Sequence, residues 1–375
     1  MKTDISCPTR RTLLGAALLG GLGAVPSLRA QGEEPEAVTV ARGLERPWSL
    51  AFLPDGRMLV TEKAGRLRVV ADGRPGAPLQ GVPAVDAGGQ GGLLDVVAAP
   101  DFASSRALYF SFSEPAPNGR GNSTAVARAV LDGERLREVQ VVFRQEPKVA
   151  SSAHFGCRLV FGRDGNLFIT LGDRFSRRDD AQDLSNHLGK IVRIAPDGSV
   201  PRDNPLLGRS GARPEIWSWG HRNVQGAALH PATGALWAHE HGPQGGDELN
   251  VVTGGRNHGW PVVTAGREYG SGAAIGQGET RADVAPALRT WVPSVAPSGM
   301  AFVTSDRYPG WKGSLLIGTL KAQRLLRLTL DGERVTGEQW LLAGLGERIR
   351  DVRQGPDGRV YLLTDNGDGR VLRLG

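Results

Sequence analysis

The sequence has few cysteines, no apolar run long enough to span a membrane and no cluster of basic residues. Two cysteines among 375 residues exclude a scaffold built on several disulfides. A membrane-spanning helix needs ~20 consecutive apolar residues, and no segment reaches that length. Lysine and arginine outnumber acidic residues by 45 to 39 but are interspersed with them. Because no recognisable nucleic-acid module is present either, nucleic acid is not expected as a partner.

Common nucleotide and hydrolase motifs are also missing. No Gly-x-Gly-x-x-Gly follows a strand and opens a helix, no Walker motif occurs, and the glycine-rich run 88–92 lies between strands. Nicotinamide or ATP bound in the usual ways is therefore not expected. The absence of Gly-x-Ser-x-Gly argues against a serine hydrolase with a nucleophile elbow.

The N-terminal 30 residues have the composition of an export signal. Arg10 and Arg11 precede a short apolar stretch, and Ala30 offers the small residue that a signal peptidase requires. The paired arginines favour the twin-arginine route. We therefore expect residues 1–30 to be a cleaved signal and the mature protein to be periplasmic or secreted. Cleavage would leave Cys157 as the only cysteine, without an intrachain disulfide partner.

A repeated pattern predicts an all-β fold. An apolar strand, a turn rich in Pro, Gly and Asp, and a strand of β-branched and aromatic residues recur six times. The copies begin at Ser49, Leu94, Arg158, Gly226, Gly299 and Arg350. Most copies are followed by a second strand pair, so each repeat predicts a four-stranded antiparallel sheet with tight Asp-Gly hairpins. Six such sheets arranged radially form a six-bladed β-propeller.

The mature chain, residues 31–375, is expected to be one propeller domain, because a propeller cannot be divided by blade. Residues 38–40 are expected to supply the strand that closes the ring against the last blade. Long inserts at 173–187, 201–213 and 254–290 interrupt the repeats. Loops at one end of a scaffold build its binding face, so we expect functional residues in these inserts.

His154 and Asp173 flank the third repeat. A hairpin of this length returns the chain to the end where it began, so both residues are expected at the same end of one blade. A histidine oriented by a carboxylate can act as a general base near neutral pH. Taken alone, a loop histidine and a turn aspartate are the simpler interpretation.

The segment 239–248 offers candidate metal ligands. Strand alternation places His239 and His241 on one face, but spacing places no third zinc ligand. Gly242 and Pro243, followed by two acidic residues, suit calcium better, because calcium takes carbonyl and carboxylate oxygens.

Basic residues are expected to converge at the propeller mouth. Arg348 and Arg350 are two apart on a strand and face the same way. Lys321 occupies the corresponding region of the preceding blade, and Arg222 stands in a Gly-His-Arg-Asn sequence. Such a set suits a polyanionic ligand, since arginine makes bidentate contacts with carboxylates. Taken alone, solvated surface charge is the simpler interpretation of each of these residues.

Together these segments resemble the soluble pyrroloquinoline-quinone-dependent sugar dehydrogenases, especially the bacterial aldose sugar dehydrogenases. They occur in family order from about residue 38 to the C-terminus. The matching segments are GQGGLLD from residue 89, HFGCRL from 154, LGD from 171, GHRNVQG from 220, EHGPQGGDE from 240, NHGWP from 257, PSVAPSG from 293, Lys321, and RIRDV from 348.

The resemblance implies roles for individual residues. His154 matches the catalytic base, Asp173 the carboxylate that orients it, and Arg222 the arginine beside the reactive quinone carbonyl. The implied contacts with pyrroloquinoline quinone are Gln90, Arg222, Asn223, His241, Ser294, Lys321, Arg348 and Arg350.

The resemblance also implies two calcium positions. The backbone carbonyls of Gly242 and Pro243 match those that hold the calcium bound to the quinone. Glu248 and His258 match a second calcium position, where His258 replaces a common tyrosine.

The implied reaction is oxidation of an aldose at C1 to a lactone, with hydride passing to the quinone and electrons to an external acceptor. His154 would take the proton of the anomeric hydroxyl. The loop 174–186 is short compared with the glucose-specific enzymes, and their dimer-forming insertions are absent. We therefore expect an open mouth, broad aldose specificity and a monomer.

Two other functions fit a six-bladed propeller. A calcium-dependent lactonase or esterase would need carboxylate and asparagine side chains that converge on a central metal, whereas this sequence offers Lys and Arg at the mouth. A non-catalytic propeller that binds sugars or a protein partner would be expected to lack the set His154, Asp173 and Arg222, which is present.

Overall fold

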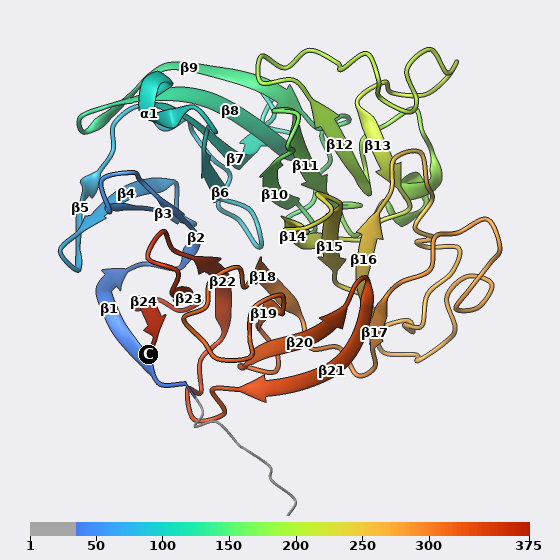
Figure 1. The fold of residues 1–375 in the computed structure, drawn as a ribbon. Coiled ribbons are helices and arrows are strands. Elements are labelled where there is room, and N and C mark those ends of the chain that lie inside the picture. The colour runs from blue at the N-terminus through green and yellow to red at the C-terminus, as the bar shows by residue number, and fades with distance from the viewer. Residues whose placement is uncertain (1–34) are drawn as a thin grey trace, which may run out of the picture. The chain divides into compact units, whose positions relative to one another are not determined.

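The computed structural model describes residues 35–375, which form six four-stranded antiparallel sheets arranged radially (Figure 1). The expected export signal, residues 1–30, lies outside the described residues. The six-bladed propeller predicted from the repeats is confirmed. In the described part of the chain, no helix is long and apolar enough to cross a membrane.

The blades are numbered in chain order. Blade 1 comprises β2 (Pro47–Phe52), β3 (Met58–Glu62), β4 (Arg66–Ala71) and β5 (Arg74–Pro78), and blade 2 comprises β6 (Leu93–Ala98), β7 (Ala107–Pro115), β8 (Asn122–Asp132) and β9 (Arg135–Arg144). Blade 3 comprises β10 (Gly156–Phe161), β11 (Leu167–Leu171), β12 (Lys190–Ile194) and β13 (Ile216–Trp219), and blade 4 comprises β14 (Val224–Leu229), β15 (Leu236–Glu240), β16 (Asp247–Val252) and β17 (Arg289–Trp291). Blade 5 comprises β18 (Pro297–Phe302), β19 (Leu315–Thr319), β20 (Leu325–Asp331) and β21 (Arg334–Leu341), and blade 6 comprises β22 (Ile349–Gln354), β23 (Val360–Thr364), β24 (Gly369–Leu374) and β1 (Ala37–Leu44). The helical elements are α1 (Phe102–Ser105) and the 3₁₀ turn η1 (Arg178–Gln182).

The two ends of the described chain share blade 6. Strand β1 pairs antiparallel with β24, so that Val38 lies opposite Arg373 and Thr39 opposite Leu372. The predicted closure of the ring by residues 38–40 is therefore confirmed. The first strand of each predicted repeat becomes the innermost strand of a blade (Figure 1).

Apolar layers between neighbouring blades form the core. Leu59 and Leu67 of blade 1 pack with Leu108 and Phe110 of blade 2, and all four are buried. Each strand in such a layer is covered on both faces, which explains the run of apolar and β-branched residues in every repeat. Full burial of one such side chain contributes roughly 1.5–3 kcal/mol.

A network of four charged side chains lies where the inner strands meet. Arg158 Nη1 lies 3.1 Å from Asp95 Oδ1 and 3.1 Å from Asp351 Oδ1. Arg353 closes the network, with Nη2 2.8 Å from Asp95 Oδ1 and Nε 2.9 Å from Asp351 Oδ2. These residues come from blades 2, 3 and 6, which can meet only near the propeller axis. Burial alone would raise the pKa of Asp95, but the charges of Arg158 and Arg353 lower it below its usual value.

The three long inserts do not all lie at one end of the propeller. Asp203, in the insert 201–213, lies 2.9 Å from Arg193. Arg193 also pairs with Asp164, in the turn that joins β10 to β11, at the end of β11 opposite Asp173. The expectation that this insert contributes to the binding face is therefore wrong, because the loop between β12 and β13 turns at the other end of the blade.

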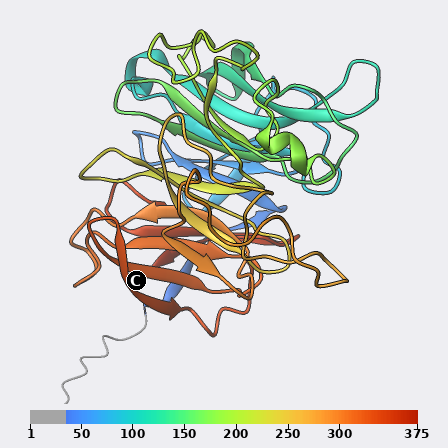
Figure 2. The same ribbon diagram turned by 90° about the vertical axis from the view of Figure 1, so that its right-hand side faces the viewer.

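The insert 254–290 reaches the Asp173 end by running back along blade 3, where Asn257 forms a parallel bridge with Trp219 of β13. It is the long yellow-to-orange loop at the right of Figure 1, which faces the viewer in Figure 2. The inserts 173–187 and 254–290 therefore build one face together.

Candidate active site

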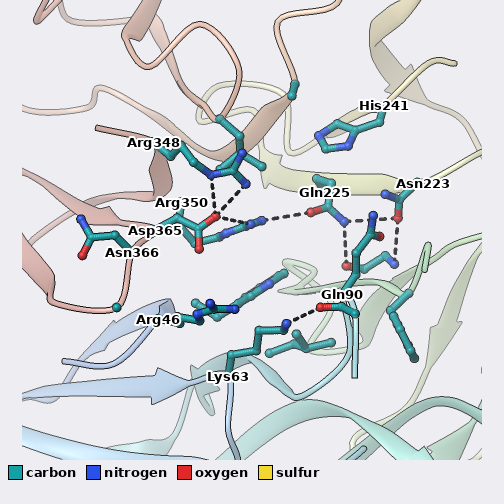
Figure 3. A pocket seen from close by; sticks show the side chains of 18 residues that line it. Arg46, Lys63, Gln90, Asn223, Gln225, His241, Arg348, Arg350, Asp365 and Asn366 are labelled. Carbon is teal, nitrogen blue, oxygen red and sulfur yellow. Dashed lines mark hydrogen bonds and ion pairs between the residues drawn. The ribbon is translucent and has the colours of Figure 1, made fainter. Parts of the chain in front are cut away.

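A cavity of about 520 Å³ opens among the inner strands and loops (Figure 3). Its lining includes five of the predicted quinone contacts: Gln90, Asn223, His241, Arg348 and Arg350. Sequence positions up to 260 residues apart are thus brought to one site.

The lining of the cavity is strongly basic. The lining contains four basic side chains and one carboxylate, that of Asp365. The basic residues are Arg46, Lys63, Arg348 and Arg350. Asp365 Oδ2 lies 2.8 Å from Nη2 of both Arg348 and Arg350, so the prediction that these two arginines face the same way is confirmed (Figure 3). Burial and then the charge of Arg46 lower the pKa of Lys63, and the charge of Asp365 opposes this shift only in part. The site suits a ligand with several negative charges.

Sequence reasoning missed part of this lining. Arg46 and Lys63 flank the first hairpin of blade 1, so the argument that paired His154 with Asp173 would have placed them together. The Trp48 ring packs against two arginines, with Cζ of Arg158 4.5 Å and Cζ of Arg350 5.9 Å from its centre. Other lining residues that the sequence analysis did not single out are Gln225, Asp365 and Asn366.

Three predicted quinone contacts do not line this cavity: Arg222, which lines two smaller cavities, Ser294 and Lys321. Lys321 and Ser294 line a neighbouring groove of about 890 Å³. The residues that separate the two spaces, Ala296 and Leu320, are joined by a backbone hydrogen bond of 2.8 Å and line the cavity itself. Lys321 therefore directly follows, in sequence, a residue that lines the 520 Å³ cavity. Because of its four basic residues we call this space the cation-lined cavity.

His154 and Asp173 are in direct contact, as predicted from the hairpin. His154 Nδ1 lies 2.6 Å from Asp173 Oδ1. The same oxygen accepts a hydrogen bond from the backbone N–H of Phe175 (2.7 Å), and Oδ2 accepts one from Trp260 Nε1 (2.8 Å). Because the carboxylate oxygens only accept, Nδ1 carries the proton and leaves Nε2 as the basic atom.

The backbone around His154 is shaped for this contact. His154 has φ +52°, a left-handed conformation that costs a non-glycine residue roughly 1–2 kcal/mol. Its N–H donates to Gln90 Oε1 at 2.8 Å, which helps to hold that conformation. The backbone at Gly172 passes close to that of His154. A Cβ on Gly172 would lie 2.1 Å from the His154 carbonyl oxygen, so only glycine allows the two segments to come this close.

The side chain of His154 is nearly buried, at 7% exposure. Burial lowers its pKa below the usual value near 6.5, and the contact with Asp173 opposes this shift in part. The side chain is therefore neutral at pH 7 and can accept a proton at Nε2.

Arg222 is held rigidly beside this pair. Its Nη1 donates to the carbonyl oxygens of His241 (3.0 Å) and Gly242 (2.6 Å), and Nη2 donates to Tyr269 Oη (3.3 Å). Its backbone N–H donates to Glu240 Oε2 (2.5 Å). The side chain is 4% exposed, so its charge is directed into the site rather than into solvent.

The Gly242–Pro243 turn offers oxygen donors of the kind that calcium prefers. The Gly242 carbonyl, however, already accepts a hydrogen bond from Arg222. Asp247 does not face a metal, because it accepts hydrogen bonds from the backbone N–H groups of Gly242, Val295 and Ala296. The turn therefore offers backbone carbonyl oxygens to a cation, whereas the Asp247 carboxylate is already engaged by backbone N–H groups.

Glu248 and His258, the second predicted calcium position, line a small cavity beneath Arg222 together with Glu240. Burial, followed by the charge of Glu240, raises the pKa of Glu248 to about 8. Within the described residues neither ring nitrogen of His258 has a hydrogen-bond partner, and the ring stacks on His221 with centroids 4.6 Å apart. The donor types suit a cation, but the side chains do not converge as in a formed metal centre.

The carboxylates nearest the axis are already paired. Asp95 and Asp351 each contact Arg158 and Arg353. They are therefore unsuited to ligate a central metal, as a calcium-dependent lactonase would require.

Comparisons with known proteins agree with this geometry. Residues 44–373 match the family described as Glucose / Sorbosone dehydrogenase. Aldose sugar dehydrogenase YliI of Escherichia coli K12 is 47% identical over 336 residues, which cover 88% of this chain and 90% of that protein. A solved structure of a glucose dehydrogenase is 49% identical with a TM-score of 0.88, and covers 91% of this chain and 99% of its own. The quinone-bound aldose sugar dehydrogenase of Streptomyces coelicolor is 32% identical with a TM-score of 0.76, and covers 91% of this chain and 97% of its own. The chain therefore belongs to the glucose/sorbosone dehydrogenase family, among its soluble aldose sugar dehydrogenases.

Proposed function

We propose that this protein oxidises aldose sugars at C1 to lactones with pyrroloquinoline quinone bound in the cation-lined cavity. The observation that carries the proposal is the position of this cavity beside the His154–Asp173 pair and Arg222. The quinone, when bound, supplies the acceptor for the hydride that leaves C1 of the sugar. The chain's own residues then have three tasks: to hold the anionic quinone, to remove the proton of the anomeric hydroxyl and to stabilise the negative charge that develops on the acceptor.

The cavity residues are suited to hold a planar tricarboxylate. Arg348 and Arg350 can make bidentate contacts with carboxylates, and Arg46 and Lys63 add charge from the opposite wall. The Trp48 ring, which lines the same cavity, offers a flat apolar surface to a planar ring system.

His154 acts as the general base. As hydride leaves C1, Nε2 takes the proton of the anomeric hydroxyl, and the imidazolium that forms is stabilised by Asp173 at 2.6 Å. General-base assistance of this kind contributes typically about 10²–10⁴ in rate. Arg222, fixed by two backbone carbonyls, stabilises the negative charge that develops on the acceptor.

Further parts of the proposal concern metals and cellular context. Carbonyl oxygens of Gly242 and Pro243 would hold a calcium that would act as a Lewis acid on the quinone, and Glu248 with His258 would hold a second. We also propose export by the twin-arginine signal, a periplasmic or secreted monomer, broad aldose specificity and an external electron acceptor. The paired arginines of the leader and the short loop 174–186 support these points.

Reconstitution tests the function. The mature apoprotein is mixed with pyrroloquinoline quinone, with and without calcium, and aldose-dependent reduction of a dye is followed. We expect activity only when both additions are present. His154→Gln should bind the quinone with unchanged affinity but lose turnover. Absence of quinone binding by the wild-type protein would refute the proposal.

A further inference from the structure

Three segments of the chain meet at Gly220, which directly follows β13. One is the end of β13 itself, the second is the turn η1, and the third is the insert 254–290. A Cβ on Gly220 would lie 2.2 Å from Asn257 Oδ1 and 2.9 Å from Gln182 Nε2. Because Gly220 also has φ +74°, only glycine fits at this junction. Trp260 belongs to the same junction, since its N–H donates to the Gly220 carbonyl oxygen at 2.9 Å.

The side-chain amides of Gln182 and Asn257 pair with each other across this junction. Gln182 Nε2 donates to Asn257 Oδ1 (3.0 Å), and Asn257 Nδ2 donates to Gln182 Oε1 (2.8 Å). Gln182 Nε2 also donates to the backbone carbonyl oxygen of Trp260 at 2.7 Å. An amide nitrogen carries two protons, so both donors of Gln182 are used to hold the segment that contains Trp260.

The turn that carries Gln182 is anchored to blade 3 by a buried ammonium group. Lys190, at the start of β12, is fully buried. Its Nζ donates to the backbone carbonyl oxygens of Asp180 (2.8 Å), Ala181 (3.1 Å) and Leu188 (2.6 Å). An ammonium group has three protons, so the backbone of this turn and the loop after it satisfies the whole group. Gln182 therefore reaches Trp260 from a turn that is fixed on the blade.

Trp260 contacts two of the predicted catalytic residues. Its Nε1 donates to Asp173 Oδ2 at 2.8 Å, and Asp173 Oδ1 lies 2.6 Å from His154 Nδ1. The centre of its ring lies 5.4 Å from Cζ of Arg222. The ring also packs against Ala181 of η1 in a buried apolar cluster. A shift of Trp260 would therefore displace the carboxylate that orients His154.

A second contact joins the same two inserts at the surface. Arg178 Nη1 lies 2.5 Å from Glu268 Oε1, and the two side chains are 42% and 36% exposed. An exposed ion pair contributes at most about 1 kcal/mol. Gln182 is half-buried and bonds the Trp260 backbone directly, so we assign the fixing of Trp260 to Gln182 rather than to this ion pair.

We propose that Gln182 is a positioning residue for sugar oxidation, which fixes Trp260 and thereby holds Asp173 and His154 in the orientation that proton removal requires. The catalytic part of this inference rests on the proposed function. A general base acts only within hydrogen-bond reach of the proton that it removes, and a misplacement of about 1 Å can lower a rate about 10²-fold. Gln182 lies in the insert 173–187, where functional residues were expected, but no motif singled it out.

Gln182→Met tests this role, because methionine is similar in length and donates no hydrogen bond. We expect kcat of the reconstituted protein to fall about two- to ten-fold, the range that one hydrogen bond contributes. The aldose KM and the quinone dissociation constant should stay near their wild-type values. If Gln182→Met fails to fold, Gln182→Glu serves instead, since it keeps the size of the side chain and its carboxylate donates no hydrogen bond.

Gln354→Met is the matched control. Gln354 also bridges two loops, with Nε2 donating to Thr304 Oγ1 (2.6 Å) and Oε1 accepting from the Thr304 N–H (2.8 Å). It stands at the end of β22 that is remote from Arg350, so it lies away from the candidate active site. Its replacement should leave kcat, the aldose KM and quinone binding unchanged.

A double-mutant cycle with Trp260→Phe separates positioning from general stabilisation. Phenylalanine keeps an apolar ring but cannot donate to Asp173, so Trp260→Phe should itself lower kcat. If Gln182 acts through Trp260, adding Gln182→Met to Trp260→Phe should lower kcat little further, because residues that act through one contact are not additive. A double variant whose loss equals the product of the two single losses would overturn the proposal.

Proton NMR of the apoprotein supplies a readout that needs no turnover. The proton shared by His154 Nδ1 and Asp173 Oδ1 should give a downfield resonance, assigned by its absence in His154→Gln. We expect this resonance to broaden or move upfield in Gln182→Met and to stay in place in Gln354→Met. An unchanged resonance in Gln182→Met would also overturn the proposal. If the resonance responds as expected but the wild type oxidises no aldose, the proposed function fails and the positioning of His154 by Gln182 stands.

Discussion

Asp173 holds His154 through Oδ1, at 2.6 Å from Nδ1, while Trp260 Nε1 holds the other carboxylate oxygen at 2.8 Å. The carboxylate cannot rotate away without breaking both contacts. Trp260 belongs to the insert 254–290, so a loop of blade 4 fixes the orientation of a base on blade 3. The orientation of His154 therefore depends on tertiary structure beyond its own blade.

This contact makes a prediction about pH. Protonated His154 cannot accept a proton, so kcat/KM should fall as pH decreases through its pKa. Because burial lowers that pKa, the midpoint should lie below 6.5. Asp173→Asn removes the negative charge that raises the pKa of His154 against the effect of burial. The midpoint should therefore move to lower pH while kcat falls. A midpoint above 6.5 in the wild type would contradict the assignment; pH–rate profiles of the reconstituted protein provide the measurement.

Lys63 provides a test of the cation-lined cavity. Lys63→Met should weaken quinone binding about ten-fold or more, because a hydrogen bond to a charged group contributes about 1.5–3 kcal/mol. The loss should shrink at high salt, since screening already weakens this interaction in the wild type. Fluorescence titration with the quinone at low and high salt measures both effects. Lys312→Met is the control, because Lys312 pairs with Asp306 on the surface and should bind as wild type.

The charge network at the axis should dominate the response of stability to mutation. Arg158→Met leaves Asp95 and Asp351 short of a partner, and removing one member of a buried pair costs about 3–5 kcal/mol. Arg57→Met breaks an exposed pair with Asp55 and should cost at most about 1 kcal/mol. Urea unfolding of the two apoprotein variants compares these costs. Equal losses would show that the network is not a special source of stability.

The same network predicts sensitivity to acid. The pKa of Asp95 is lowered in the folded state, so its contribution is present above the unfolded-state value near 3.9 and is lost as pH falls through the folded value. Stability of the wild type should therefore decline below about pH 4. In Asp95→Asn this part of the decline should be absent, although the variant starts from a lower stability. Urea unfolding between pH 3 and pH 7 checks the slope.

Cys157 should be chemically inert in the folded protein. Burial raises the pKa of its thiol to about 12, and the thiolate is the reactive form. A disulfide-exchange reagent at pH 8 should label it only after unfolding. Labelling of the native protein at the rate of a free thiol would show that the core around β10 opens readily.

The sequence predicted the features that are local. Asp-Gly turns and strand pairs are short-range signals, so the predicted blade starts at Ser49, Leu94 and Arg158 lie within two residues of the observed strand starts. The pairing of Asp95 with Arg353 could not be predicted, because it requires knowing that the inner strands of blades 2 and 6, which flank blade 1, meet near the axis. The ion pair between Arg178 and Glu268 likewise depends on how two inserts fold against each other.

The shared blade at the chain ends has a consequence for biosynthesis. Ala37 pairs with Leu374, so the last blade needs residues made at the beginning and at the end of translation. A nascent chain can assemble inner blades while still attached to the ribosome, but the seam closes only after release. Loss of β1 by proteolysis or of β24 through a premature stop codon would therefore damage the same blade.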